Sequence, residues 1–247
     1  MDSQLLDMGQ WAETNFGECD LGDQRRTKRL VKYAAQVAAF SEGSTPNQTE
    51  SWADCKAVYR LFDEEDVTFD AVCRPHWNRT KSRSAGVFLL LGDTTEVSFG
   101  YNSPRAGLSP VGPGKHRGFH LHTSLMVDPR SEEVVGVAGA EIFHRQPKPK
   151  KEKTREKKNR PRESEVWGRV IDQVGPAQGT ARFIHVFDAG AVNYEVFCRM
   201  KQQGVGWVVR ACQKHRIVLD STGNRRALSK VLADAPPVGT YTLSLRS

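Results

Sequence analysis

The sequence predicts an α/β protein in which an all-helical N-terminal region precedes a core built on a mixed sheet. Residues 1–80 contain apolar positions at helical spacing. Residues 81–212 read in order as strand, strand, strand, helix, strand, helix, strand. This order gives a three-stranded meander that passes into right-handed βαβ crossovers. We therefore expect a helical domain over 1–80, a sheet domain over 81–212, and a further segment over 213–247.

The chain of 247 residues carries a net charge of +7, and most of this charge lies in one segment. Residues 145–162 contain ten Lys or Arg residues against two Glu residues, so the rest of the chain is nearly neutral. Such a segment is typical either of a phosphate-binding element or of a solvated loop, and the sequence leaves both open.

Composition excludes several classes of protein. No apolar run approaches the roughly 20 residues of a membrane span, and the N-terminus lacks the features of a secretory leader, so we expect a cytoplasmic protein without a membrane partner. The cysteines are odd in number, widely spaced and without a C-x-x-C pair, which indicates reduced packing residues. They are Cys19, Cys55, Cys73, Cys198 and Cys212.

A strongly basic amphipathic helix is predicted after Asp23. Its apolar face is formed by Leu30, Ala34, Val37 and Ala38. Its early turns carry Arg25, Arg26, Lys28, Arg29 and Lys32, with no acidic residue among them. Like charges one turn apart cost a few tenths of a kcal/mol, a cost that contacts with a polyanion would offset. Phosphate binding and plain solvation of this face both remain open.

Two further helices are predicted before residue 80. Thr45 to Gln48 has the pattern of a capping box with Pro46 at the first helical position. The helix that follows carries an apolar stripe, which we interpret as core rather than as a platform for stacking bases. The stripe consists of Trp52, Cys55, Tyr59 and Phe62. Thr68 begins the third helix.

The first predicted strand, residues 87–91, is a run of five apolar residues followed by Gly92 and Asp93. Such a run fits a strand buried on both faces. Residues 182–187 repeat the pattern and end at Asp188. Each aspartate taken alone fits a turn residue. Because the first and fourth strands can be parallel neighbours, however, the two carboxylates are expected to meet at one edge of the sheet.

Two converging carboxylates favour a bound cation, and an oxygen-only pair favours Mg²⁺ or Mn²⁺. One or two such ions can activate a water molecule or a 3′-hydroxyl for phosphodiester displacement. His120 and His122 share one face of the second strand, but without a third ligand at a useful spacing we favour a structural or phosphate-contacting role for them. The Gly- and Pro-rich residues 102–115 are expected to form a functional loop.

Several motifs resemble the DDE transposases of bacterial insertion sequences, in particular the group that contains transposon five. In the N-terminal region the similar stretches are Trp11-Ala12-Glu13, Phe16-Gly17, Leu21-Gly22-Asp23, residues 25–30 and residues 57–62. In the core they are Asp93-Thr94-Thr95, residues 117–124, residues 163–167, Asp188 and residues 208–210. The resemblance extends over residues 11–247, except for the loops at 102–115 and 145–162.

The resemblance implies a ribonuclease-H-like core that binds inverted-repeat transposon ends. It implies nicking of the DNA with two Mg²⁺ ions and joining of the freed end to target DNA by a homodimer on double-stranded DNA, hence a nucleoid-associated protein. By position it assigns Asp93 and Asp188 as catalytic metal ligands. It assigns Arg25, Arg26, Lys28, Arg29 and Arg210 as DNA contacts.

The sequence departs from this family in two places. Asp188 is followed by an apolar run instead of the charged run that is common in the family. The family's third carboxylate, a Glu within a motif of Tyr, Arg and Lys, does not occur, and residues 239–247 resemble the start of the β-rich insertion that precedes it. Glu96 and Glu195 are poor substitutes by position, because Glu195 lies about 10 Å along a helix from Asp188.

Three hypotheses follow from the sequence. The first is a transposase in a truncated form that retains DNA recognition and two of three metal ligands. The second is a catalytically inactive protein that occupies transposon ends and inhibits the intact enzyme. The third is a metal-dependent nuclease of the same fold that is complete in itself.

Overall fold

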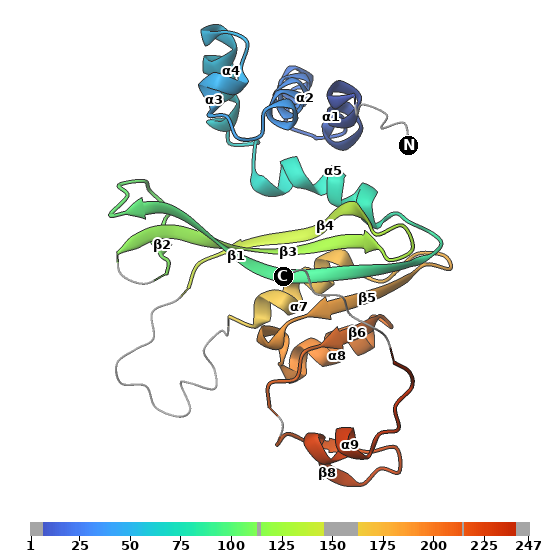
Figure 1. Cartoon of the computed structure of the whole chain (residues 1–247). Helices are drawn as coiled ribbons and strands as arrows, with labels where there is room; N and C mark the ends of the chain where they lie inside the picture. Colours follow the sequence, from blue (N-terminus) through green and yellow to red (C-terminus); the bar gives the residue numbers. More distant parts are fainter. Residues whose placement is uncertain (1–6, 113–114, 146–162, 214, 241–247) are drawn as a thin grey trace.

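The computed structural model describes residues 7–112, 115–145, 163–213 and 215–240. In Figure 1 the described chain is arranged in layers. The first four helices lie above, α5 lies between them and a mixed sheet, and α7 and α8 cover the lower face of that sheet. The expected α/β class, with N-terminal helices and a mixed sheet, is confirmed.

The N-terminal helices pack around a small apolar core. They are α1 (Met8–Phe16), α2 (Gln24–Ala39), α3 (Thr45–Gln48), α4 (Trp52–Phe62) and α5 (Phe69–Lys81). The core is formed by Cys19, Leu21, Leu30 and Leu61, with Phe16 and Val72 packed against it. Several helices begin at a side-chain cap, since Asp23, Ser51 and Thr68 each accept a backbone N–H from the first turn.

The prediction for the region of α3 and α4 was wrong in two respects. Ser44, not Thr45, is the residue that precedes α3, and α3 ends after four residues, so α4 begins anew at its own cap, Ser51. The predicted core stripe is also wrong, because Trp52, Tyr59 and Phe62 are exposed and Cys55 alone of the four is buried. The buried face of α4 is formed by Cys55, Val58 and Leu61.

The sheet has the strand order β4-β3-β1-β5-β6, with β2 beside β3. The strands are β1 (Val87–Tyr101), β2 (Ser109–Pro110), β3 (His116–Asp128), β4 (Glu133–Phe143), β5 (Arg182–Phe187) and β6 (Gly206–Val209). β3 is antiparallel to β1 and β4, whereas β5 is parallel to β1 and β6 is parallel to β5. The expected parallel pairing of the first and fourth strands is confirmed.

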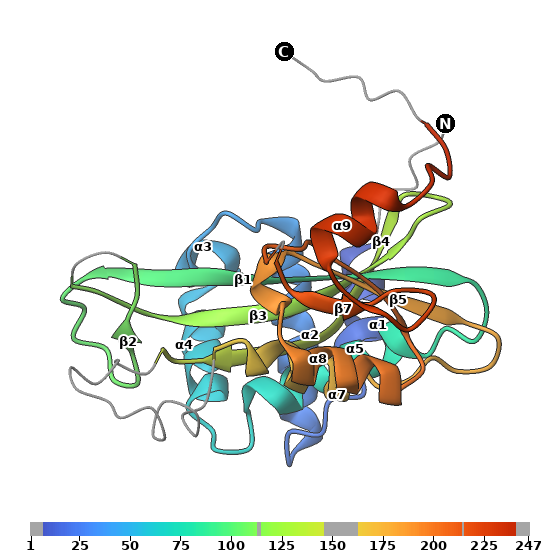
Figure 2. The ribbon, with the colours of Figure 1, turned by 90° about the horizontal axis from the view of Figure 1, so that it is seen from below.

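The sequence predicted that the first strand ends before Asp93, and this prediction was wrong. The parallel ladder with β5 stops at the pair Gly92–Phe187, but β1 continues through Asp93 because its other edge stays paired with β3 as far as Tyr101. The last third of β1 and the first residues of β3 therefore project beyond β5 and β6 as an arm, visible in Figures 1 and 2. The predicted loop at 102–115 contains β2, which pairs with β3, and its described residues belong to this arm.

The main apolar core lies between the sheet and two crossover helices, α7 (Glu165–Val174) and α8 (Tyr194–Gln202), which Figure 2 shows from the helix side. Leu90 and Phe183 on the strands pack with Trp167, Ile171 and Met200 on the helices. The opposite face of the sheet is covered by α5 along β4, while Leu91 and Val208 on that face are exposed, Val208 to 60 %.

The described C-terminal residues form a small separate unit below the sheet in Figure 1. It consists of β7 (Ile217–Leu219), β8 (Arg225–Ala227) and α9 (Leu228–Asp234). The basic residues 146–162 and the end of the predicted β-rich segment, 241–247, lie outside the described residues.

The described helices include none that is both long enough and apolar enough to cross a membrane. All the cysteines are free. Cys19 and Cys55 are buried as expected for packing residues, whereas Cys212 is exposed and does not fit that expectation.

Candidate nucleic-acid interface and candidate metal centre

The basic start of α2 is a surface on which each cation has a different environment. Arg25 forms a bidentate ion pair with Asp23, the N-cap of its own helix, and its side chain remains 90 % exposed. This guanidinium lowers the pKa of the Asp23 carboxyl to about 2, and the carboxylate in turn raises the pKa of Arg25. Arg25 therefore faces solvent as one half of a local pair.

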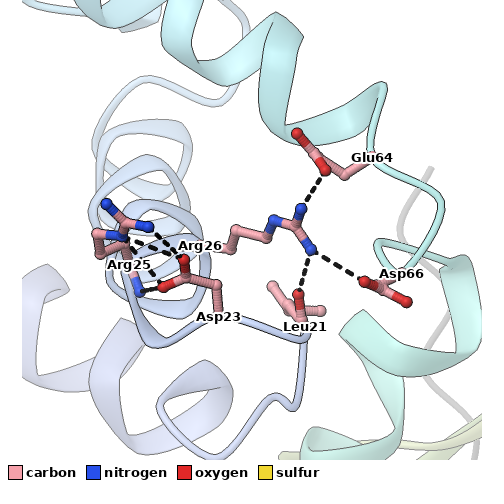
Figure 3. Close-up of polar contacts among 6 residues, drawn as sticks. All are labelled: Leu21, Asp23, Arg25, Arg26, Glu64 and Asp66. Atoms are coloured by element: carbon pink, nitrogen blue, oxygen red, sulfur yellow. Dashed lines mark hydrogen bonds and ion pairs between the residues drawn. The ribbon is translucent and has the colours of Figure 1, made fainter.

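Arg26 points in the opposite direction, into the helical unit (Figure 3). Its Nη1 donates to the carbonyl of Leu21 at 2.9 Å and to the Asp66 carboxylate at 3.0 Å, and its Nη2 pairs with Glu64. The side chain is 27 % exposed. Arg26 thus connects the start of α2 to the segment between α4 and α5, which is a structural role.

Lys28 and Arg29 are the cations of this cluster that are free to meet a phosphate. Both side chains are exposed, and neither forms an ion pair within the described part of the chain. Lys32, one turn further, pairs with Glu50 at 2.9 Å and with Asp54 at 3.1 Å. An open groove of about 360 Å³ runs between α2 and α4. It is lined by Arg25, Lys28, Arg29, Lys32, Tyr33, Gln36, Asp54 and Val58.

Acidic side chains from other elements explain how the like charges on α2 are tolerated. Glu50, Asp54, Glu64 and Asp66 come from α4 and from the segments that flank it. These partners lie 18 to 40 residues from their cations in sequence. The spacing of residues within α2 does not reveal these acidic partners. The sequence alone therefore could not distinguish the cations that form ion pairs from those that do not.

The two candidate metal ligands are placed side by side by the register of the sheet. Gly92 pairs with Phe187 at the end of the β1–β5 ladder, so Asp93 and Asp188 occupy the next position on adjacent parallel strands. Neighbouring strands lie about 4.8 Å apart, and residues at matching positions of a parallel pair project from the same face. Both aspartates are exposed.

Each aspartate has one oxygen committed to a backbone N–H. Oδ1 of Asp93 accepts the N–H of Thr94 at 2.8 Å. Oδ1 of Asp188 accepts the N–H of Gly190 at 2.8 Å, which makes Asp188 the cap of the short helical turn η1 (Ala189–Ala191). These bonds fix the two carboxylates and leave the second oxygen of each available to a cation.

Arg210 continues the line of the two aspartates. Val209 of β6 is the partner of Phe187, and the N–H of Arg210 donates to the Phe187 carbonyl at 3.0 Å. Arg210 therefore follows the end of β6 at the register position of Asp188, and its side chain is exposed. A cation beside the two carboxylates suits contact with a phosphate near a metal site.

His122 lies beneath this edge, on the face that α7 covers. Its Nδ1 lies 2.8 Å from the Thr94 hydroxyl, and its ring packs against Trp167 with centroids 4.4 Å apart. Burial lowers the pKa of His122 to about 4 against the opposing effect of Asp93 and Asp188. The imidazole is therefore neutral near pH 7, and the hydrogen bond with Thr94 braces β1 next to Asp93.

The other candidate acidic residues lie apart from the two aspartates. Glu96 pairs with the buried His120, whose Nε2 lies 3.4 Å from its carboxylate. Glu195 is an exposed residue in the first turn of α8 and donates its N–H to the side chain of Asn193. Within the described residues, no group of three His, Cys, Asp or Glu side chains is arranged to hold a metal ion.

A comparison with known protein families gives a match in the N-terminal region. Residues 8–67 match the family model described as the transposase DNA-binding domain. The matched range contains α1 to α4, with the basic helix α2 and the groove between α2 and α4. The helical N-terminal region is therefore of the transposase DNA-binding type, and DNA is its partner.

Proposed function

We propose that this chain is a DDE-type insertion-sequence transposase, or a form of one, that binds transposon ends through its helical region. The observation that carries the proposal is the combination of a transposase-type DNA-binding region with two carboxylates at one register position on parallel strands. The mixed sheet, with its single antiparallel strand beside the first strand, supports the ribonuclease-H-like core expected from the resemblance.

The donor set at the sheet edge fits a divalent cation. Asp93 and Asp188 supply oxygen atoms only, which suits Mg²⁺ or Mn²⁺, and both are oriented by bonds to backbone N–H groups. A bound ion would supply a polarised phosphate and an activated water or hydroxyl for phosphodiester displacement. In this scheme the carboxylates hold the ion, Arg210 contacts a phosphate, and the bond between His122 and Thr94 keeps β1 in place.

The DNA-binding part of the proposal assigns the phosphate contacts to Lys28 and Arg29. Alanine at both positions should weaken the binding of duplex DNA and make it less dependent on salt. Each lost phosphate contact lowers the slope of log K against log salt by about 0.9. Lys201→Ala, an exposed cation on α8, is the matched control. If the double variant binds DNA with unchanged affinity and an unchanged salt slope, Lys28 and Arg29 are not phosphate contacts.

The metal part is tested with Mn²⁺ alone, measured by calorimetry or by electron paramagnetic resonance of the free ion. Asp93→Asn and Asp188→Asn should each lower the affinity at least tenfold, because each removes one of two charged ligands. Asp63→Asn, an exposed carboxylate at the end of α4, is the control and should bind normally. Equal affinity in all four proteins would exclude this edge as the metal site.

A second candidate function is an inactive protein that occupies transposon ends and inhibits the intact enzyme. The observation that favours it is that, among the described residues, no third metal-ligating side chain joins Asp93 and Asp188. The two candidates differ in one assay, the nicking of end DNA in the presence of Mg²⁺. Nicking that is lost in Asp93→Ala supports the enzyme, whereas tight binding without nicking supports the inhibitor. The synaptic homodimer and the joining to target DNA belong to the first candidate.

A further inference from the structure

The arm is formed by residues 95–101 of β1 and 116–121 of β3, together with the segment 102–112, which contains β2. Two aromatic side chains near its tip are exposed, Phe99 to 40 % and Tyr101 to 61 %. Exposed aromatic rings on a projecting ribbon are unfavourable in water unless a partner covers them. The sequence marked part of this region as a functional loop, and the DNA-binding match at residues 8–67 does not include it.

The segment at the tip is held in a defined conformation. The guanidinium of Arg117 donates to the carbonyl of Leu108, and β2 pairs with Gly118 and Arg117 of β3. Val111 is 2 % exposed, and its N–H donates to the carbonyl of His116. The tip is therefore a preorganised element, which reduces the entropy that it loses on binding a partner.

The same tip already carries a stacked cation. The guanidinium of Arg105 lies 4.9 Å from the ring centroid of Phe99, and the Phe99 ring contacts Phe119 with centroids 5.9 Å apart. Arg105 is exposed, and no ion pair within the described residues involves it. An exposed arginine positioned over an aromatic ring can contact a phosphate oxygen while no carboxylate compensates its charge.

The charge of the arm points to an anionic partner. Residues 95–121 contain Arg105, Lys115 and Arg117 against one carboxylate, Glu96, which faces His120. The net positive charge therefore matches the phosphate backbone of duplex DNA better than it matches a second copy of this chain, which would bring the same positive charge to the contact.

The position of the arm relates it to the candidate metal centre. Asp93, Val97 and Phe99 are separated by even numbers of residues on β1, so strand alternation places them on one side of the strand. At about 3.4 Å per residue, Phe99 lies roughly 20 Å along the strand from Asp93. A duplex that reaches the two carboxylates can continue along this side of the arm.

We propose that the arm is a second duplex-binding element, separate from α2, in which Arg105 contacts a backbone phosphate and Phe99 packs against the DNA beside it. The proposal rests on the proposed function, since it takes DNA as the substrate of the edge formed by Asp93 and Asp188. It assigns DNA contact to a part of the chain that lies outside the matched DNA-binding region.

The test uses the full chain and a fluorescein-labelled duplex of about 30 base pairs, roughly 100 Å long. Phe99→Ala combined with Arg105→Ala should weaken binding about tenfold and lower the salt slope by about 1. The same loss should appear when these changes are added to Lys28→Ala and Arg29→Ala, because the two surfaces act independently. Controls are Val134→Ala, an apolar side chain exposed on β4, and Lys201→Ala.

Photo-crosslinking gives a second readout that does not depend on stability. A duplex that contains 5-bromodeoxyuridine should crosslink to the peptide that includes Phe99 and Tyr101. Circular dichroism verifies that the variants remain folded.

Each contrary outcome has a distinct meaning. Normal DNA binding by the arm variant with no crosslink to the arm, while the α2 variant binds weakly, overturns the arm proposal and leaves the proposed function intact. Normal binding by both variants overturns the arm proposal and the assigned α2 contacts together. A change in the sedimentation of the DNA-free protein on Phe99→Ala, without a change in DNA affinity, assigns the arm to self-association and also overturns the proposal.

Discussion

Replacing Arg26 with alanine should destabilise the helical unit and leave phosphate contacts intact. The change removes a charged hydrogen bond to the Leu21 carbonyl and ion pairs with Glu64 and Asp66. A hydrogen bond from a charged donor contributes about 1.5 kcal/mol or more. The two ion pairs are partly exposed, with Glu64 and Asp66 43 % and 65 % accessible, so each contributes only about 0.5 kcal/mol. The free energy of unfolding should therefore fall by about 2 to 3 kcal/mol.

The assay is thermal unfolding of the full chain, followed by DNA binding at a temperature well below the transition. A loss of this size lowers the Tm of a chain of this length by about 5 °C or more. Lys28→Ala, which changes an exposed side chain on the same helix, should leave the Tm within about 1 °C of wild type. An Arg26→Ala variant with an unchanged Tm and DNA binding as weak as that of Arg29→Ala would refute the reasoning. Arg26 would then be the DNA contact that the sequence suggested.

Three further predictions concern the sheet. Gly118→Ala should destabilise the arm and lower the Tm, because the added methyl group would lie 3.0 Å from a Val111 methyl carbon and press on the carbonyl of Val97. Gly92→Ala should weaken Mn²⁺ binding, since its Cβ would collide with the Phe187 ring, directly before the candidate ligands. Burial lowers the pKa of His185 from 6.5 to about 4. The unfolded chain therefore binds this proton more readily, so stability is full above pH 6.5 and is lost as the pH falls toward 4, by roughly 3 kcal/mol. His185→Leu should flatten this decline in urea titrations at several pH values.

The sequence predicted the order of strands and crossover helices because each core segment is short and has a clear period. The run at 87–91 is apolar, and the run at 182–187 is apolar apart from Arg182 and His185, which favours a central parallel pair of strands, although Leu91 is exposed in the structure. Each run is followed closely by an aspartate, and the register that pairs Gly92 with Phe187 places Asp93 beside Asp188. The existence of the candidate site was therefore predictable.

The errors have a common physical cause, which is that tertiary contacts decide burial on a helix. The stripe with Trp52 and Tyr59 has helical spacing, yet the face of α4 that packs on α2 is the one with Val58 and Leu61. A similar limit applies to Arg26 and Arg29, which look equivalent in sequence and differ only in what other elements place next to them. β1 extends beyond Asp93 because it pairs with β3 there. The residues of β1 itself show no pattern that predicts this extension.

His76 of α5 forms hydrogen bonds with the two elements on either side of its helix, α1 and β4. Its Nε2 accepts the N–H of Val137 on β4 at 3.0 Å, which leaves Nδ1 to donate to Asn15 of α1 at 2.8 Å. Burial and Arg79 lower the pKa of His76, which preserves the neutral ring that this arrangement requires. His76 thus links α1 and α5 to the sheet, in addition to the packing of α5 along β4.

If the proposed function is correct, this junction fixes the position of the helical unit relative to the candidate metal centre. α5 packs along β4, so the helical unit and the sheet are held in one arrangement. A fixed junction would keep a constant offset between the DNA bound by α2 and the phosphate presented to Asp93. The place where a strand is cut would then be set by the geometry of the protein, and the bases at that place need not be read at all.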